Sequence, residues 1–239
     1  MRLRNIPGAR EEVSESRFAV NLPAEQRGQW RSLFRQQYPD GRDTGEMPLY
    51  IEVGMGKGRF LTEMAAQHPE ALFAGIEMYE SVLIKAVQKL ERLEEQGVLC
   101  PNLLLIREDA RLLPDLFAEG EVDKIFLNFS DPWPKARHAK RRLTSHQFLE
   151  RYGKILKPGG TVEFKTDNQE LFTFSLEEAR EAGWEILVNT RDLHHEPALM
   201  EGNVMTEYEQ KFSAKGNPIC KMVIKMTNSH LVDNGTYLW

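Results

Sequence analysis

A short stretch of the chain, residues 127–135, carries the residue types for chemistry on a nucleobase. Asp131 follows an apolar run with the composition of a buried strand, so we expect its carboxylate at the end of that strand. Pro132 and Pro134 restrict the turn that follows, and Trp133 stands between them with a large aromatic face. This layout is typical of a site that holds a base, and Asp131 is its candidate catalytic residue.

A dense basic run follows this turn and points to an anionic partner. Five of the eight residues from 135 to 142 are lysine or arginine, and such charges repel one another unless an anion lies beside them. The net charge of the chain is −5, so any contact with a polyanion must come from local clusters. We therefore predict that this run binds nucleic acid. A sparser N-terminal group, formed by Arg2, Arg4 and Arg10, is equally consistent with a solvated tail.

A glycine-rich turn after an earlier apolar run predicts a cofactor site. Gly54, Gly56 and Gly58 allow a tight turn and let the backbone pass close to a ligand. Their spacing is not the dinucleotide pattern Gly-x-Gly-x-x-Gly, and no Gly-Lys-Ser/Thr is present for a phosphate loop. Glu52 beside the turn would repel a pyrophosphate but attract an ammonium group. Since S-adenosylmethionine has an amino-acid moiety and NAD does not, we predict S-adenosylmethionine as the cofactor.

Two further carboxylates are expected where the next strands end. Glu77 ends the second expected strand, about twenty residues beyond the glycines, where a carboxylate can accept both ribose hydroxyls. Asp109 follows the third expected strand and could accept a hydrogen bond from the adenine amino group. Either residue alone could be a surface or capping carboxylate, but their positions at successive strand ends favour a shared ligand.

Apolar runs alternate with helical patterns from residue 49 onward, which predicts an α/β fold with a mostly parallel sheet and helices on both faces. Two short segments, 210–214 and 219–226, flank Gly216-Asn217-Pro218 and predict a closing antiparallel hairpin. Ligands of such sheets bind beyond the carboxyl ends of the strands, where the candidate residues fall. The other expected strands are 49–53, 72–77, 103–107, 124–128, 161–165 and 185–189, and the expected helices are 59–67, 80–95, 145–156 and 170–182.

The length of 239 residues, with 41% hydrophobic, fits one substantial core. Residues 1–47 are polar and broken by prolines, with a short helix near 30–34, so we expect an N-terminal arm beside a main domain of residues 48–227. We assign no role to residues 228–239. Because no stretch has the apolar length of a membrane span and no apolar signal region follows Met1, we expect a cytoplasmic protein without membrane contact. Two distant cysteines and one His-His-Glu run suggest no metal site.

Together the motifs closely resemble those of bacterial tRNA (guanine-N7)-methyltransferases. The resemblance spans roughly residues 2–226 and rests on the glycine turn, the Asp-Pro-Trp-Pro element with its basic run, residues 164–168, and residues 206–209. It implies the class I methyltransferase fold with a Rossmann-like sheet, S-adenosylmethionine as donor, and 7-methylguanosine at position 46 of the tRNA variable loop as product. Ala136 departs from the family, where relatives often carry another basic residue.

The same resemblance implies a role for each candidate residue. Glu52, Glu77, Asp109 and Asp131 would contact the cofactor; Lys135, Asp167, Thr206, Glu207, Tyr208 and Glu209 would contact the substrate; and Arg137, His138, Lys140, Arg141 and Arg142 would contact RNA.

The implied reaction needs alignment and charge rather than a general base. Guanine N7 carries a lone pair and no proton, so the enzyme must align it with the methyl group and stabilise the positive charge that moves onto the purine. We expect Asp131 to do both, and Asp167 to hold the Watson–Crick edge of the base.

Two alternatives stay open from the sequence. Asp131-Pro132-Trp133 also resembles the Asp-Pro-Pro-aromatic motif of enzymes that methylate the adenine N6 amino group, although the second proline does not follow the first directly. A non-catalytic RNA-binding module with a relic cofactor fold is the other, and the intact carboxylates oppose it. The preferred tRNA species, and the choice between monomer and homodimer, are not determined by the sequence.

Overall fold

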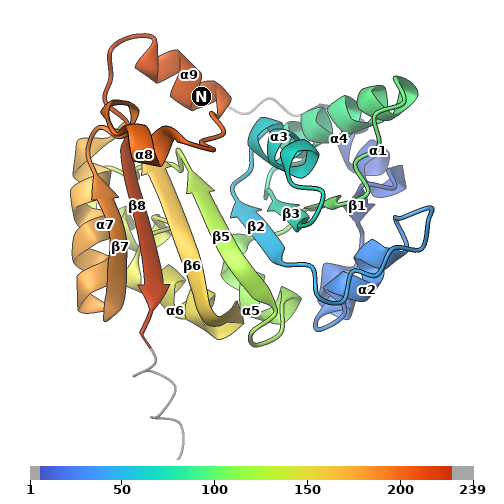
Figure 1. Cartoon of the computed structure of the whole chain (residues 1–239), viewed down its shortest axis with the longest axis horizontal. Coiled ribbons are helices and arrows are strands. Elements are labelled where there is room, and N and C mark those ends of the chain that lie inside the picture. Colours follow the sequence, from blue (N-terminus) through green and yellow to red (C-terminus); the bar gives the residue numbers. More distant parts are fainter. Residues whose placement is uncertain (1–5, 228–239) are drawn as a thin grey trace, which may run out of the picture.

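Eight strands form one sheet in the order β1-β4-β3-β2-β5-β6-β8-β7 (Figure 1). The computed structural model describes residues 6–227. All neighbouring strands are parallel except β8, which is antiparallel to both β6 and β7. The strands are β1 (Ala19–Val20), β2 (Leu49–Val53), β3 (Leu72–Ile76), β4 (Leu103–Ile106), β5 (Val122–Asn128), β6 (Leu156–Thr166), β7 (Trp184–Thr190) and β8 (Cys220–Met226).

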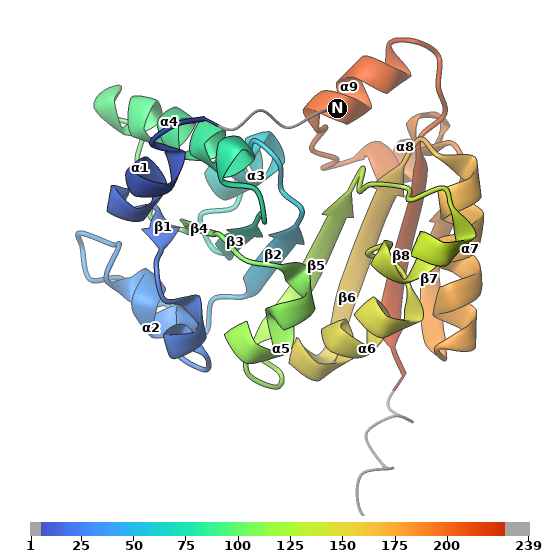
Figure 2. The same cartoon turned by 180° about the vertical axis from the view of Figure 1, so that it is seen from behind.

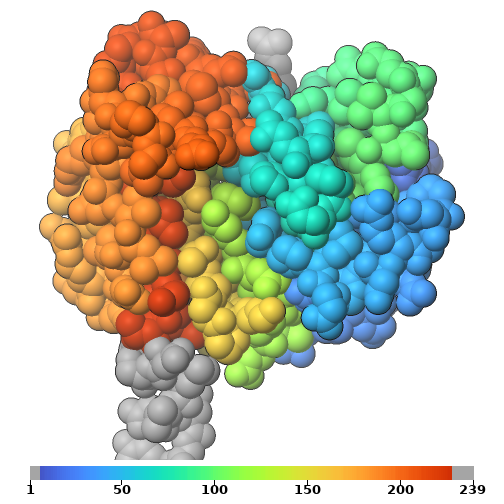
Figure 3. Space-filling view, viewed as in Figure 1, coloured from blue at the N-terminus to red at the C-terminus, as the bar shows by residue number. Residues whose placement is uncertain are grey.

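Helices cover both faces of this sheet. One face of the half that contains β2, β3 and β4 is covered by α3 and α4, and the opposite face of β5, β6 and β8 is covered by α5, α6 and α7 (Figure 2). On the face of the sheet opposite α5, α6 and α7, atoms of β6 and β8 are visible at the surface (Figure 3). The helices are α1 (Ala9–Glu15), α2 (Trp30–Arg35), α3 (Arg59–Gln67), α4 (Glu80–Glu95), α5 (Leu113–Leu116), α6 (His146–Ile155), α7 (Gln169–Glu181), α8 (Pro197–Met200) and α9 (Glu207–Ser213).

The predicted alternation of strands and helices is confirmed. Buried parallel strands are apolar on both faces, and every residue of β3 and β4 is buried, which explains why these segments read as continuous apolar runs. The amphipathic helices α3, α4, α6 and α7 each begin and end within two residues of the predicted limits. Within residues 6–227, no helix is both long and apolar enough to cross a membrane.

The predicted closing hairpin is wrong, because residues 210–214 do not form a strand. Most of that segment belongs to α9, which begins where the Thr206 hydroxyl accepts a hydrogen bond of 3.0 Å from the backbone N–H of Glu209. This side-chain cap satisfies a free donor of the first turn and favours a helix over an extended chain. β8 instead lies between β6 and β7, with Val162 opposite Ile224 and Ile186 opposite the same residue.

Residues 6–47, expected as an arm, take part in the sheet and its core. β1 pairs in parallel with β4 at the sheet edge. Trp30 is fully buried, donates a hydrogen bond of 2.8 Å from its indole N–H to the carbonyl of Leu116, and stacks on Phe117 with ring centroids 5.0 Å apart. The Glu121 carboxylate accepts hydrogen bonds from the backbone N–H groups of Gly28 and Trp30. The N-terminal segment is therefore anchored to the end of the sheet opposite the glycine turn.

Replacing Trp30 should show that this segment stabilises the whole fold. Trp30→Ala removes a buried aromatic ring and is expected to lower the free energy of unfolding by about 3–5 kcal/mol. The measurement is a urea titration followed by circular dichroism. Leu22→Ala, at a side chain that is 59% exposed, is the control and should change stability by less than about 0.5 kcal/mol. A loss below about 1 kcal/mol for Trp30→Ala would contradict the anchoring role.

Candidate active site

The winding of the sheet reverses between β2 and β5, and the candidate residues gather at the carboxyl ends of these strands. β2 pairs with β3 on one side and with β5 on the other, with Glu52 opposite Phe126. The two parallel strands end at the same edge of the sheet, so the loops that follow them lie next to each other. One loop is the glycine turn, residues 54–58, and the other is the Asp-Pro-Trp-Pro loop, residues 129–135.

The glycine turn requires glycine for backbone reasons. Gly54, Gly56 and Gly58 have φ values of 77°, 59° and 71°, in the left-handed region that residues with a Cβ avoid. A Cβ on Gly58 would lie 3.0 Å from the Cβ of Ala86 in α4, so this position also needs glycine for close packing. The turn therefore presents backbone, rather than side chains, to a ligand at the start of α3.

Glu52 is a buried carboxylate with one oxygen that lacks a partner. Its Oε1 accepts a hydrogen bond of 2.8 Å from the Asn128 side-chain amide, whereas Oε2 and the Asn128 Oδ1 have no hydrogen-bond partner. Burial raises the pKa of Glu52 to about 8. Orphaned buried acceptors are costly, and a bound ammonium group would supply the missing donors and favour the ionised carboxylate. The amino-acid moiety of S-adenosylmethionine meets this requirement.

Glu77 supports the glycine turn from the end of β3. Its Oε2 accepts a hydrogen bond of 3.1 Å from the backbone N–H of Gly56, and its Oε1 accepts one of 3.0 Å from the N–H of Tyr79. Burial raises the pKa of Glu77, and the negative charge of Asp131 acts in the same direction. Glu77 and Asp131 are thus close enough to interact, and each Glu77 oxygen keeps a lone pair for a ribose hydroxyl.

Asp109 lies at the end of β4 and is already engaged. It caps a short 3₁₀ helix (Ala110–Leu112) by accepting a hydrogen bond of 2.8 Å from the backbone N–H of Arg111, and it pairs with the Arg111 guanidinium at 2.6 Å. Its hydrogen bonds with Arg111 lower the pKa of the Asp109 carboxyl. An adenine amino group could bind here only by sharing the carboxylate with this arginine.

The Asp-Pro-Trp-Pro loop is held in an unusual backbone conformation. Phe129 and Trp133 have φ values of 51° and 41°, although neither is glycine. Such left-handed residues cost about 1–3 kcal/mol each and persist only where the surroundings enforce them. Asp131 lies between these two residues in the chain and is exposed. Backbone strain is thus concentrated on the two sides of the candidate catalytic carboxylate.

The basic run forms a 3₁₀ helix (Ala136–Arg141) directly after this loop, and its side chains do not all face solvent. Lys135 precedes this helix and is exposed, as are Arg137, Lys140 and Arg141. His138 is half-buried and meets the edge of Trp133 with ring centroids 5.7 Å apart. Arg142 is half-buried and bonds to the preceding loop, so the run divides into outward-facing and inward-facing cations.

Helix α9 lies over the glycine turn and supplies two residues of the predicted substrate segment. Glu207 pairs with Lys57 of the turn at 3.5 Å. Tyr208 is 53% exposed and stacks on Phe129, with ring centroids 6.3 Å apart and planes at 20°. Its ring also stacks on Phe212 of the same helix, with ring centroids 6.0 Å apart, so Tyr208 lies in an aromatic cluster beside the strained loop. Asp167, at the end of β6, is half-buried.

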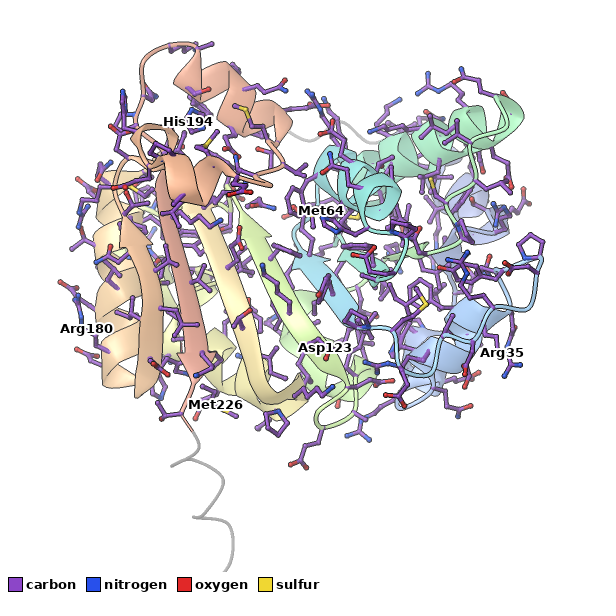
Figure 4. The ribbon with its side chains drawn as sticks, in the orientation of Figure 1. Arg35, Met64, Asp123, Arg180, His194 and Met226 are labelled. Atoms are coloured by element: carbon purple, nitrogen blue, oxygen red, sulfur yellow. The ribbon has the colours of Figure 1, made fainter. Side chains whose placement is uncertain are left out.

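Glu209 and Thr206 face inward rather than toward the mouth of the site. The Glu209 carboxylate is fully buried and accepts hydrogen bonds from the Lys165 ammonium at 2.7 Å and from the Asn203 amide at 2.8 Å. It also pairs with His194 at 3.1 Å, at the upper edge of the sheet in Figure 4. Burial would raise the pKa of Glu209, but these partners lower it overall. Both predicted residues therefore brace α9.

Three polar residues of this region escaped the sequence analysis. Asn128 holds Glu52, whereas Lys165 and Asn203 hold Glu209. The position of Lys165 in the apolar run of β6 was a signal that could have revealed this ion pair from the sequence, since buried lysines require a partner. Among residues 6–227, no group of three or more His, Cys, Asp or Glu side chains could hold a metal ion.

Comparisons with known proteins agree with this geometry. A family model described as "Putative methyltransferase" matches residues 46–222. The tRNA (guanine-N(7)-)-methyltransferase of Lachnoclostridium phytofermentans is 48% identical over 93% of this chain and 97% of its own length. The enzyme of the same name from Bacillus subtilis is 43% identical over 94% and 99%. The chain belongs to the tRNA (guanine-N7)-methyltransferase family.

Solved structures share the fold of this family member at low sequence identity. The 16S rRNA methyltransferase KamB matches with a TM-score of 0.57 and 17% identity, over 82% of this chain and 92% of KamB. A 16S rRNA (adenine(1408)-N(1))-methyltransferase from Catenulisporales acidiphilia matches with a TM-score of 0.54 and 15% identity, over 87% and 92%. These similarities establish the methyltransferase fold and carry no information on the target atom.

The raised pKa of Glu52 predicts that ligand binding releases a proton. At pH 7 a carboxyl with a pKa near 8 is mostly protonated, and an ammonium group placed beside it favours ionisation. Binding of S-adenosylhomocysteine, which carries the same amino-acid moiety, should release close to one proton. Isothermal titration calorimetry in phosphate and Tris buffers measures this number.

The isosteric variant Glu52→Gln provides the control, because it cannot ionise and should release almost no proton. A wild-type protein that releases no proton at pH 7 would exclude Glu52 as the ammonium partner.

In the ligand-free protein, the raised pKa of Glu52 also makes the free energy of unfolding depend on pH. The contribution of protonated Glu52 is fully present below about pH 4.5 and is lost as the pH rises through about 8.

Proposed function

We propose that this protein transfers the methyl group of S-adenosylmethionine to N7 of the guanine at position 46 in the variable loop of tRNA. The observation that carries the proposal is that Glu52, Glu77 and Asp131 lie at or just beyond the carboxyl ends of three neighbouring strands, β2, β3 and β5, with exposed basic residues following Asp131. The similarity of nearly the whole chain to enzymes named for guanine-N7 methylation of tRNA supports it.

The residues of the chain divide the binding work in this proposal. When bound, S-adenosylmethionine supplies an electrophilic methyl group on a sulfonium. Glu52 pairs with its ammonium group, Glu77 accepts the ribose hydroxyls, and the backbone of the glycine turn contacts the remainder of the ligand. Asp109 accepts from the adenine amino group by sharing its carboxylate with Arg111.

Asp131 acts on the base. Its exposed carboxylate, which follows the end of β5, holds guanine with N7 toward the methyl group and stabilises the positive charge that develops on the purine. Tyr208 offers a stacking face and Asp167 an acceptor for the Watson–Crick edge. Lys135, Arg137, Lys140 and Arg141 neutralise phosphates around the target nucleotide.

Identification of the product tests the proposal. Purified protein is incubated with S-adenosylmethionine and an unmodified tRNA transcript, and the digested RNA is analysed by mass spectrometry. 7-Methylguanosine is expected, and it should disappear when the guanine at position 46 is replaced by adenine. Formation of N6-methyladenosine would favour the amino-group alternative, and the absence of any methylated nucleoside would favour a binding module.

Neutralising Asp131 separates its effect on the reaction from cofactor binding. Asp131→Asn keeps the side-chain shape but removes the charge that stabilises the purine cation, so kcat should fall by about 10²–10³-fold. The dissociation constant for S-adenosylhomocysteine should change by less than about threefold, since the variant retains most cofactor contacts. Asp115→Asn, at an exposed position on α5, is the matched control and should retain wild-type kcat. Near-normal turnover of Asp131→Asn would contradict this role.

A further inference from the structure

We propose that Arg142 is a positioning residue, which fixes the Asp-Pro-Trp-Pro loop from inside the molecule and does not bind RNA. Its guanidinium Nε donates a hydrogen bond of 3.0 Å to the carbonyl of Pro132, and a terminal nitrogen donates one of 3.1 Å to the carbonyl of Trp133. One planar fork thus holds two consecutive carbonyls directly after Asp131. This inference rests on the proposed function, because it concerns how that catalytic carboxylate is placed.

The loop has few other hydrogen bonds that could fix it. Pro132 and Pro134 have no backbone N–H to donate. Within the described residues, Arg142 supplies the hydrogen bonds that reach the backbone of residues 130–134 from elsewhere in the chain. Trp133 has a φ of 41°, a conformation that an unrestrained tryptophan would leave. The Arg142 fork therefore opposes relaxation of the strained turn.

Arg142 is itself held on its other side. Its guanidinium carbon lies 4.3 Å from the centroid of the Phe174 ring, which belongs to α7. Its backbone N–H donates a hydrogen bond of 3.0 Å to the carbonyl of Ala139. The next residue, Leu143, accepts a hydrogen bond of 2.9 Å from the hydroxyl of the fully buried Tyr152. The side chain is thus stacked and bonded between α7 and the loop.

The adjacent arginine behaves differently, although the sequence presents the two as equivalent. Arg141 is exposed, and its guanidinium lies over the Trp133 ring at 5.0 Å from the centroid. A phosphate could therefore reach Arg141 without breaking an internal hydrogen bond. A phosphate that engaged the fork of Arg142 would have to displace the carbonyls of Pro132 and Trp133.

Lysine cannot replace Arg142 in this role. A lysine ammonium keeps the positive charge but lacks the planar fork that bonds two carbonyls and stacks on a ring. Arg142→Lys should therefore lower kcat at saturating tRNA by about 10–100-fold through misplacement of Asp131. The salt dependence of tRNA binding is compared in Arg142→Ala and Arg141→Ala, because both changes remove a charge. Arg142→Ala should keep the wild-type slope, whereas Arg141→Ala should reduce it by about one.

A control distinguishes this effect from simple destabilisation. Arg31 also donates to two carbonyls, those of Met47 and Glu121, but it lies beside Asp123 at the opposite end of β5 (Figure 4). Arg31→Lys should lower thermal stability as much as Arg142→Lys or more, and should retain wild-type kcat. The comparison shows whether loss of a guanidinium fork reduces turnover only beside Asp131.

A spectroscopic signature reports the loop without relying on activity. In protein labelled with 5-fluorotryptophan, the ¹⁹F resonance of Trp133 should shift or broaden in Arg142→Lys, while those of the buried Trp30 and Trp184 should not move. Phe174→Leu keeps the arginine and removes its ring support. It provides the same readouts, with a smaller loss of kcat, if Arg142→Lys does not fold.

Two results would overturn the proposal: a salt slope reduced by about one in Arg142→Ala, or a kcat of Arg142→Lys above half of the wild-type value together with an unchanged Trp133 resonance. These outcomes are separate from failure of the proposed function. If the wild-type protein formed no 7-methylguanosine, the Trp133 resonance would still test whether Arg142 fixes the loop.

Discussion

The site depends on the parallel pairing of β2 with β5. This pairing places Glu52 opposite Phe126 and brings the loops that follow the two strands to one edge of the sheet. Residues more than seventy positions apart, such as Glu52 and Asn128, then form a buried hydrogen bond near the ends of these strands. Because the winding reverses here, the helices that follow β2 and β5 cover opposite faces of the sheet, and ligands of such sheets bind beyond the strand ends at this point.

Two buried carboxylates near the carboxyl ends of the strands differ in whether their hydrogen bonds are satisfied. Lys165 and Glu209 are both fully buried, and they satisfy each other together with Asn203 and His194, so the network braces α9. Glu52 is equally buried, but one of its oxygens has no partner. A satisfied network adds rigidity, whereas an unsatisfied acceptor is an energetic cost that a ligand can remove. This contrast distinguishes structural carboxylates from binding carboxylates at the same end of the sheet.

Much of this protein was determined by its sequence alone. Continuous apolar runs in β3 and β4 and the 3.6-residue periodicity of α3 and α4 predict the α/β fold, because the order of apolar residues along each segment indicates which of its faces are buried. The sequence also predicted the glycine turn, because the left-handed backbone conformation at these positions strongly favours glycine. These features depend on residues that are close together in the chain.

The tertiary structure decided the roles that depend on distant partners. The sequence predicted a strand over residues 210–214, and the buried Lys165 favours the helix instead by pairing with Glu209 in its first turn. Arg141 and Arg142 are adjacent and of the same type, yet only Arg142 stacks on Phe174 and donates hydrogen bonds to the loop carbonyls. Sequence specifies which groups can form a hydrogen bond or an ion pair, but only the packing of α7, α9 and the sheet determines which pairs meet.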